Sequence, residues 1–134
     1  MTAWTSDELA RIGAAEEVQI APLGPDGTLL KPVTVWLVRH GDGLYVRSAV
    51  KGRDAAWFRA VQETHGGQVR TGKLARDVTF TTADHDLDDQ VDTAYRTKYR
   101  RYAGRILNTC LTPDARSTTL ELVPRSARQS IAPA

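Results

Sequence analysis

The sequence of 134 residues contains a single cysteine, Cys110, and no long hydrophobic run. One cysteine forms no disulfide within the chain and is too few for a cysteine-based metal cluster. No apolar segment approaches the roughly 18 residues that suggest a membrane-spanning helix. The N-terminal residues also lack the basic and then apolar segments of a secretory signal. We therefore expect a cytoplasmic protein with no membrane partner.

The sequence also lacks a large excess of positive or negative charge. The 18 Lys and Arg residues are nearly balanced by 16 Asp and Glu residues, which leaves a net charge of +2. Nucleic-acid-binding domains usually carry a clear basic patch or stripe. The basic residues between positions 96 and 105 lie near the C-terminal end of a predicted helix, where they suit the helix macrodipole. We therefore expect no nucleic-acid partner.

Motifs of common catalytic and metal sites are absent too. The three histidines, His40, His65 and His85, fall at predicted turns and lack the spacing of metal ligands. The sequence has no serine nucleophile elbow, P-loop or dinucleotide-binding fingerprint. We expect no metal site, and the sequence identifies no catalytic residue.

What is present is the pattern of one folded domain, with 41% hydrophobic and 25% charged residues. The capping box of Thr5 and Glu8 begins the first helix. The pattern predicts helices over residues 6–13, 54–64 and 87–102, and strands over residues 17–21, 28–39, 44–49, 68–71, 74–82 and 118–123. This order lacks regular βαβ alternation, so it favours a mainly antiparallel α+β domain or a barrel. We assign residues 1–125 to one domain and 126–134 to a C-terminal tail that is flexible or docked on a partner.

Aromatic residues make up only 7% of the chain, and their positions are informative. Tyr95, Tyr99 and Tyr102 follow i, i+4, i+7 spacing on the third predicted helix. This spacing predicts a packing stripe, with a dimer surface as the alternative. Trp36 and Trp57 are expected to pack in the core rather than to contact a ligand.

Several segments occur in an order and spacing typical of a known superfamily. They are Trp4-Thr5-Ser6-Asp7-Glu8-Leu9, Lys31-Pro32-Val33, Leu44-Tyr45-Val46-Arg47-Ser48, Trp57-Phe58, Arg76-Asp77-Val78-Thr79-Phe80 and Thr118-Thr119-Leu120-Glu121-Leu122-Val123-Pro124. Over these segments the chain resembles a small bacterial family of unknown function within the split β-barrel flavoproteins. It is also similar to deazaflavin-dependent nitroreductases and to pyridoxamine-phosphate-oxidase-like proteins. The resemblance implies an α+β fold, a mainly antiparallel, FMN-binding-like split β-barrel with about three helices.

The resemblance also implies that FMN or a deazaflavin coenzyme binds at a homodimer interface. In such barrels, basic and hydroxyl residues between a strand and the next helix hold the cofactor phosphate. The residues at this place are Arg47, Ser48, Lys51, Gly52 and Arg53. Phosphate binding needs cationic side chains, hydroxyl groups and free amides that converge on one anion, and this segment supplies all three. A solvated basic loop is the alternative.

Two further residues are candidates for cofactor contacts. Thr34 lies on a strand where the resemblance places contacts to an isoalloxazine-type ring. Arg76 shares the apolar face of a predicted strand, and a buried charge there must find an anion. A ligand is one source of that anion. Asp77, Asp84 or a strand bulge is the alternative.

The resulting hypothesis is a flavin- or deazaflavin-dependent oxidoreductase. The cofactor would carry out hydride transfer, and the protein would orient it. The alternative is a non-catalytic split barrel that binds a small ligand or a cofactor. Nitroreductases of the deazaflavin branch usually have an Asn where this chain has Ala60, so the resemblance does not extend to a substrate.

Overall fold

The computed structural model describes residues 3–125, so the predicted tail at 126–134 lies outside the described residues. Within this described part, seven strands form one sheet in the order β2-β1-β5-β6-β7-β4-β3, and every neighbouring pair is antiparallel. Their bounds are β1 (Val18–Pro22), β2 (Val33–Val35), β3 (Leu37–His40), β4 (Gly43–Val46), β5 (Gly66–Thr71), β6 (Leu74–Thr82) and β7 (Leu120–Pro124). The predicted mainly antiparallel α+β fold is confirmed.

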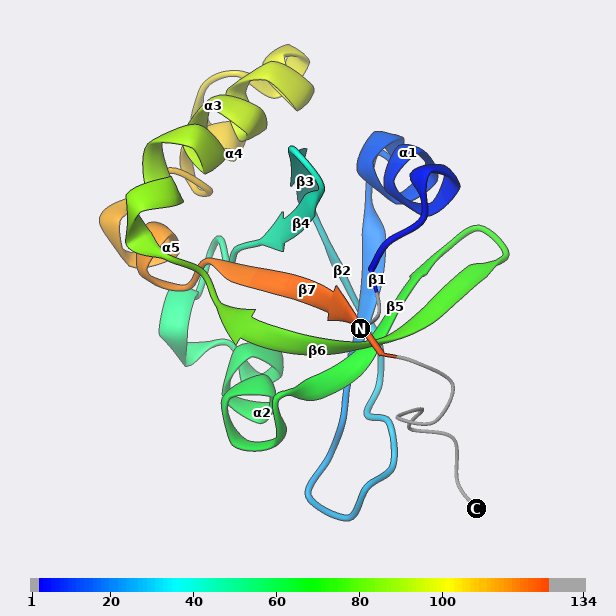
Figure 1. The fold of residues 1–134 in the computed structure, drawn as a ribbon. Coiled ribbons are helices and arrows are strands. Elements are labelled where there is room, and N and C mark those ends of the chain that lie inside the picture. The colour runs from blue at the N-terminus through cyan, green and yellow to red at the C-terminus, as the bar shows by residue number, and fades with distance from the viewer. Residues whose placement is uncertain (1–2, 126–134) are drawn as a thin grey trace.

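Among the described residues, three longer helices correspond to the three predicted from sequence, and they lie around the barrel (Figure 1). They are α1 (Ser6–Ala14), α2 (Ala56–Thr64) and α3 (Asp88–Lys98). Two short helices that the sequence did not predict, α4 (Arg105–Asn108) and α5 (Pro113–Ser117), lie between α3 and β7. Short 3₁₀ turns complete the fold: η1 (Gly52–Asp54), η2 (His85–Leu87) and η3 (Arg100–Tyr102). No helix in the described part of the chain is long and apolar enough to cross a membrane.

The predicted strand over residues 28–39 is two strands, β2 and β3, separated only by Trp36. β2 pairs with β1, whereas β3 pairs with β4, so the two halves lie at opposite ends of the strand order. The chain therefore bends at Trp36 and connects the two ends of the sheet. This bend turns the seven strands into a nearly closed barrel.

Side chains of α3 and of its C-cap residue, Tyr99, bind the backbone at this bend. The Tyr95 hydroxyl donates a hydrogen bond to the Trp36 carbonyl at 2.8 Å. The Leu37 amide donates to the Tyr99 hydroxyl at 3.3 Å, and Lys98 Nζ donates to the Leu37 carbonyl at 2.5 Å. The Trp36 ring stacks on Tyr99, with 4.1 Å between the ring centroids and 4° between the planes. The predicted tyrosine stripe is thus a packing stripe, and it also supplies hydrogen bonds.

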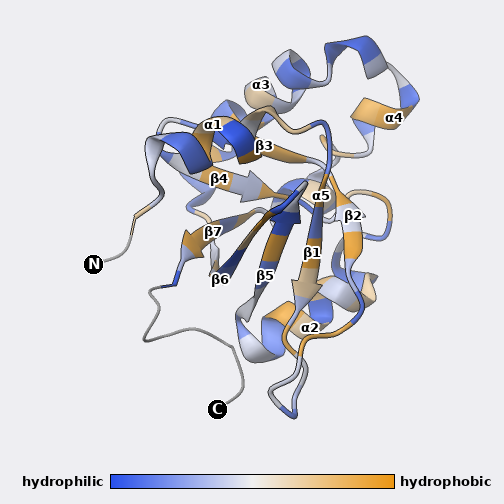
Figure 2. Ribbon diagram, turned by 90° about the vertical axis from the view of Figure 1, so that its right-hand side faces the viewer, coloured by the Kyte–Doolittle hydropathy of each residue, from blue (hydrophilic) through white to orange (hydrophobic). Residues whose placement is uncertain are grey.

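The core has two parts because β4 is buried on both faces. Successive side chains of a strand alternate between its faces. Leu44 and Val46 point into the barrel, where they join the interior cluster. Tyr45 points the other way and joins the cluster beneath α3, together with Val91 and Tyr95. Figure 2 shows orange, apolar stretches on several strands of the sheet, such as β1 and β7.

We predict that Tyr95→Phe lowers the free energy of unfolding by about 1–3 kcal/mol, because the Trp36 carbonyl loses its donor. Urea denaturation of the variant and the wild type measures this loss. Tyr102→Phe is the matched control, since the Tyr102 hydroxyl donates to the exposed side chain of Glu16. The control should lose less than half as much. Equal losses would contradict the role of Tyr95 at the bend.

Candidate functional site

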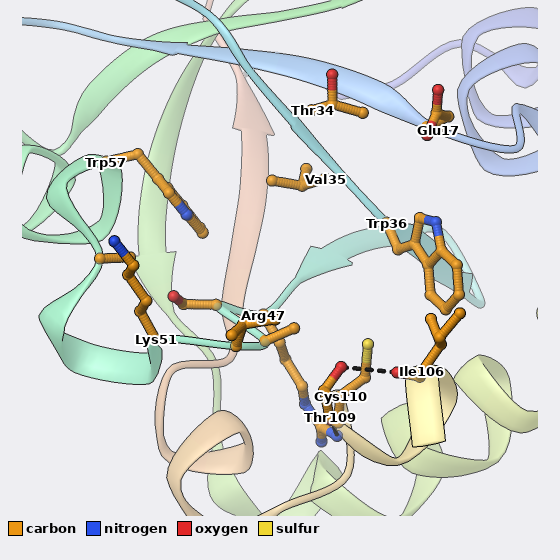
Figure 3. Close-up of a pocket in the computed structure, with 14 residues that line it drawn as sticks. Glu17, Thr34, Val35, Trp36, Arg47, Lys51, Trp57, Ile106, Thr109 and Cys110 are labelled. Atoms are coloured by element: carbon orange, nitrogen blue, oxygen red, sulfur yellow. Dashed lines mark hydrogen bonds between the residues drawn. The ribbon is translucent and has the colours of Figure 1, made fainter. Parts of the chain in front are cut away.

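A pocket of about 500 Å³ lies beside the Trp36 bend. β2, the residues after β4, the start of α2 and the segment from α4 to Cys110 form its wall. Trp36 and Trp57 lie on opposite sides, with Val35 between them and Ile106 next to Trp36 (Figure 3). Small-molecule sites are concave and mostly apolar, with volumes of about 300–1,000 Å³. This pocket has the size and lining of such a site.

Arg47 contributes its stem to the pocket, but its guanidinium group points away into the protein (Figure 3). The residue is only 2% exposed. Its Nε donates to Thr119 Oγ1 at 2.8 Å, and its Nη1 donates to Asp92 Oδ1 and to the Cys110 carbonyl. Its Nη2 donates to the Asp88 carbonyl at 3.1 Å. Because these partners are all within the protein, we revise the expected role of Arg47 from phosphate ligand to structural residue.

Besides Arg47, the members of the predicted phosphate loop that line the pocket are Ser48 and Lys51. The Ser48 amide donates to Thr118 Oγ1 at 2.9 Å, which fixes the residue at the end of β4. Within residues 3–125, neither the Ser48 hydroxyl nor the Lys51 ammonium group makes a hydrogen bond or an ion pair. Both groups are therefore available to a ligand.

The other two members of that loop do not line the pocket. Gly52 has a φ of +52°, and a Cβ there would lie 1.6 Å from Asp114 Oδ2. The position therefore requires glycine for the packing of η1 against α5, which explains the residue without a ligand. Arg53 is exposed, and its Nη2 donates to the Ser117 carbonyl at 3.3 Å.

Arg76 also lies outside the pocket. It forms an ion pair with Glu8 at the start of α1, and its guanidinium carbon lies 5.6 Å from the centre of the Trp4 ring. Burial raises the pKa of Glu8, but hydrogen bonds from the Thr5 amide and from Arg76 bring it below its ordinary value. The expected anion thus exists, but it is neither a ligand nor one of the two predicted aspartates. Glu8 caps α1 with one oxygen and binds Arg76 with the other.

Thr34, the remaining predicted residue, is exposed on β2 at the upper rim of the pocket (Figure 3). Sequence reasoning missed Ile106, Cys110 and Glu17, and it placed Trp57 in the core alone. Trp57 does pack against the core, but it also lines the pocket. No sequence signal separates an apolar pocket wall from a core residue. Burial raises the pKa of the Cys110 thiol, so the group is neutral at neutral pH.

The histidines lie away from this pocket, because none is among the described residues that line it. His65 ends α2 in the left-handed conformation, and His85 Nδ1 lies 3.2 Å from Asp88 Oδ2. Across residues 3–125, no group of three or more His, Cys, Asp or Glu side chains has an arrangement that could hold a metal ion.

Comparison with known proteins gives a family and a fold. The model of the family described as "uncharacterized protein conserved in bacteria" (DUF2255) matches residues 8–122. No curated protein matches the chain.

Several solved structures have a similar fold at low sequence identity. HutZ, the heme storage protein of Vibrio cholerae, has a TM-score of 0.60 and 13% identity, with 91% of each chain covered. A FAD-binding protein of Mesorhizobium loti has a TM-score of 0.54 and 12% identity, with 93% of each chain covered. An F420 reductase has a TM-score of 0.51 and 16% identity, with 88% of this chain and 93% of that chain covered. The likeness establishes the predicted split β-barrel.

We predict that Arg47→Ala lowers the free energy of unfolding by about 3–5 kcal/mol, because the buried Asp92 carboxylate loses its nearer cation, at 2.5 Å, and keeps only the longer ion pair with Arg116, at 3.4 Å. Urea denaturation measures this change. Lys51→Ala is the control at the same loop and should change stability by no more than about 0.5 kcal/mol. If the two variants lose equal stability, Arg47 does not have the structural role assigned to it.

We also predict a pH effect from Lys98, because burial lowers its pKa from 10.5 to about 8. Between about pH 8 and about pH 10 the unfolded chain keeps a proton on Lys98 that the folded chain has released. The stability that Lys98 contributes therefore rises with pH in this range. Relative to Lys98→Met, the wild type should gain roughly 1–2 kcal/mol between pH 7 and pH 9.5. Urea denaturation at both pH values measures this gain, and an unchanged difference would contradict the prediction.

Proposed function

Because the chain belongs to the DUF2255 family and folds as a split β-barrel, we propose that it binds a flavin-type cofactor in the pocket beside Trp36. The observation that carries this proposal is the pocket itself. It combines aromatic and aliphatic walls with a hydroxyl and an ammonium group that have no partner among the described residues. Cofactor sites characteristically pair a large apolar surface with a few well-placed polar groups.

The residues of the pocket fit the parts of FMN or of a deazaflavin coenzyme. Val35, Trp36 and Trp57 supply apolar surface for a planar ring. Ser48 and Lys51 supply a hydroxyl and a cation for a phosphate, and Thr34 supplies a hydroxyl at the rim. When bound, the cofactor would supply hydride transfer, so the chain would act as an oxidoreductase.

The similar solved structures support a cofactor but include more than one kind. One is described as FAD-binding and another as an F420 reductase, whereas HutZ is described as a heme storage protein. Haem iron is held by an axial ligand such as His, Met, Tyr or a cysteine thiolate. The described lining of this pocket has no His, Met or Tyr, and its one thiol has a raised pKa. These residues favour a flavin-type ring over haem.

We further propose that the chain is a cytoplasmic homodimer whose interface covers the mouth of the pocket. Val50 and Ile106, which both line the pocket, are 83% and 58% exposed. Large apolar side chains that are exposed together at a concave site mark an interaction surface. A second copy of the chain would bury them together with the cofactor.

Titration of the purified protein with FMN and with the deazaflavin coenzyme, followed by fluorescence, tests the cofactor proposal. We expect saturable binding of one of them. Lys51→Ala should weaken it about tenfold, the equivalent of one charge-assisted hydrogen bond to phosphate. Lys31→Ala is the matched control, because Lys31 is an exposed lysine that does not line the pocket.

The outcomes separate binding from catalysis. No saturable binding of either cofactor would refute the proposal. Binding that is equal in Lys51→Ala and in the control would refute the phosphate position. A bound cofactor that reduces no test acceptor would make the chain a non-catalytic carrier, the alternative that the sequence left open.

A further inference from the structure

A second groove, of about 330 Å³, borders the pocket described above. Glu17 and Thr34 line both, so they form the boundary between the two. Thr34 on β2, Gln19 on β1 and Arg70 on β5 lie side by side in register across the three strands. Because side chains alternate along a strand and the neighbouring Val69 is buried, Gln19 and Arg70 point to the outer face of the barrel. We call this region the outer groove.

Only the Nε of the Arg70 guanidinium group is hydrogen-bonded within the described residues. Its Nε donates to Gln68 Oε1 at 2.6 Å, and Gln68 Nε2 donates in turn to Asp77 Oδ1 at 3.1 Å. The two terminal nitrogens of Arg70 make no hydrogen bond or ion pair within residues 3–125. The guanidinium group is therefore oriented by the protein and keeps unused donors in the outer groove.

We propose that the outer groove is a second ligand site, in which Arg70 binds the carboxylate of a small organic acid. A guanidinium group presents paired N–H donors whose spacing matches the two oxygens of a carboxylate. Gln19, Thr34 and Thr71 supply amide and hydroxyl groups for the rest of the molecule. The site borders the proposed cofactor site and shares Glu17 and Thr34 with it, but Arg70 lines only the outer groove, so binding at Arg70 does not depend on a bound cofactor.

The surroundings of Arg70 favour a carboxylate over a phosphate. Arg70 is the sole cation in the described lining of the outer groove, whereas phosphate sites usually gather several cations or backbone amides. Glu17 shares the groove, and its charge repels a dianion more strongly than a monoanion. The volume also lies at the lower end of the range for small-molecule sites, which suits a compact acid.

Two-dimensional NMR of the ¹⁵N-labelled chain tests this site with benzoate as the probe and benzyl alcohol as its neutral analogue. Benzoate should shift the Arg70 Nε–H signal and the amide signals of Gln19 and Thr71 in a saturable manner. Arg70→Gln should weaken benzoate binding about tenfold, because the paired donors are lost. Glu17→Gln should strengthen it, because a repelling charge is removed.

Arg39→Gln is the matched control for net charge. Arg39 is exposed, donates to the Gly41 carbonyl and does not line the outer groove. The proposal is overturned if benzoate binds equally to Arg70→Gln and Arg39→Gln, if benzyl alcohol binds as tightly as benzoate, or if no probe binds. Tighter binding of inorganic phosphate than of benzoate would also overturn it. An FMN titration of the same variants separates the two proposals, since Arg70→Gln should leave FMN affinity unchanged.

Discussion

The structure depends on how α3 satisfies the backbone at the Trp36 bend. A strand that bends between two pairings leaves backbone groups without ladder partners, and buried backbone groups need a hydrogen bond. Tyr95, Tyr99 and Lys98 supply these bonds from a single helix face. The bend connects β2 to β3 and so makes the barrel nearly closed, and Trp36 itself forms part of the pocket wall. The nearly closed barrel and the pocket wall thus both depend on this one bend.

Arg47 provides a second attachment between α3 and the barrel. The guanidinium group reaches Asp92 on α3 and also the backbone carbonyl of Cys110. A buried charge is tolerated only when it is paired and fully hydrogen-bonded, and Arg47 meets this condition with partners from three segments. The charge of Arg47 is therefore paired with groups of the protein and is not available to a ligand. In this loop, the groups available to a ligand are the Ser48 hydroxyl and the Lys51 ammonium group.

Features that depend on residues close together in the sequence could be predicted. Features that depend on contacts between residues far apart in the sequence could not. The capping box of Thr5 and Glu8 and the tyrosine stripe follow from local spacing, and both are present. The single long strand predicted over residues 28–39 was wrong, because its two halves pair with β1 and with β4, which are distant in the sheet. Sequence reasoning recognised that a buried Arg76 needs an anion. It could not tell that Glu8, 68 positions away, supplies that anion in place of a ligand.

Four of the basic residues fall into two groups according to their partners, and this division has a consequence for the ligands. Arg47 and Arg76 are neutralised by carboxylates of the protein. Lys51 at the pocket and Arg70 in the outer groove have donors without a partner among the described residues. Glu17 lies at the boundary between these two sites. A long polyanion that joined Lys51 to Arg70 would have to pass a carboxylate of its own sign, at a cost in free energy. The charge distribution therefore favours two separate anionic groups, one on each side of Glu17, over a single extended one.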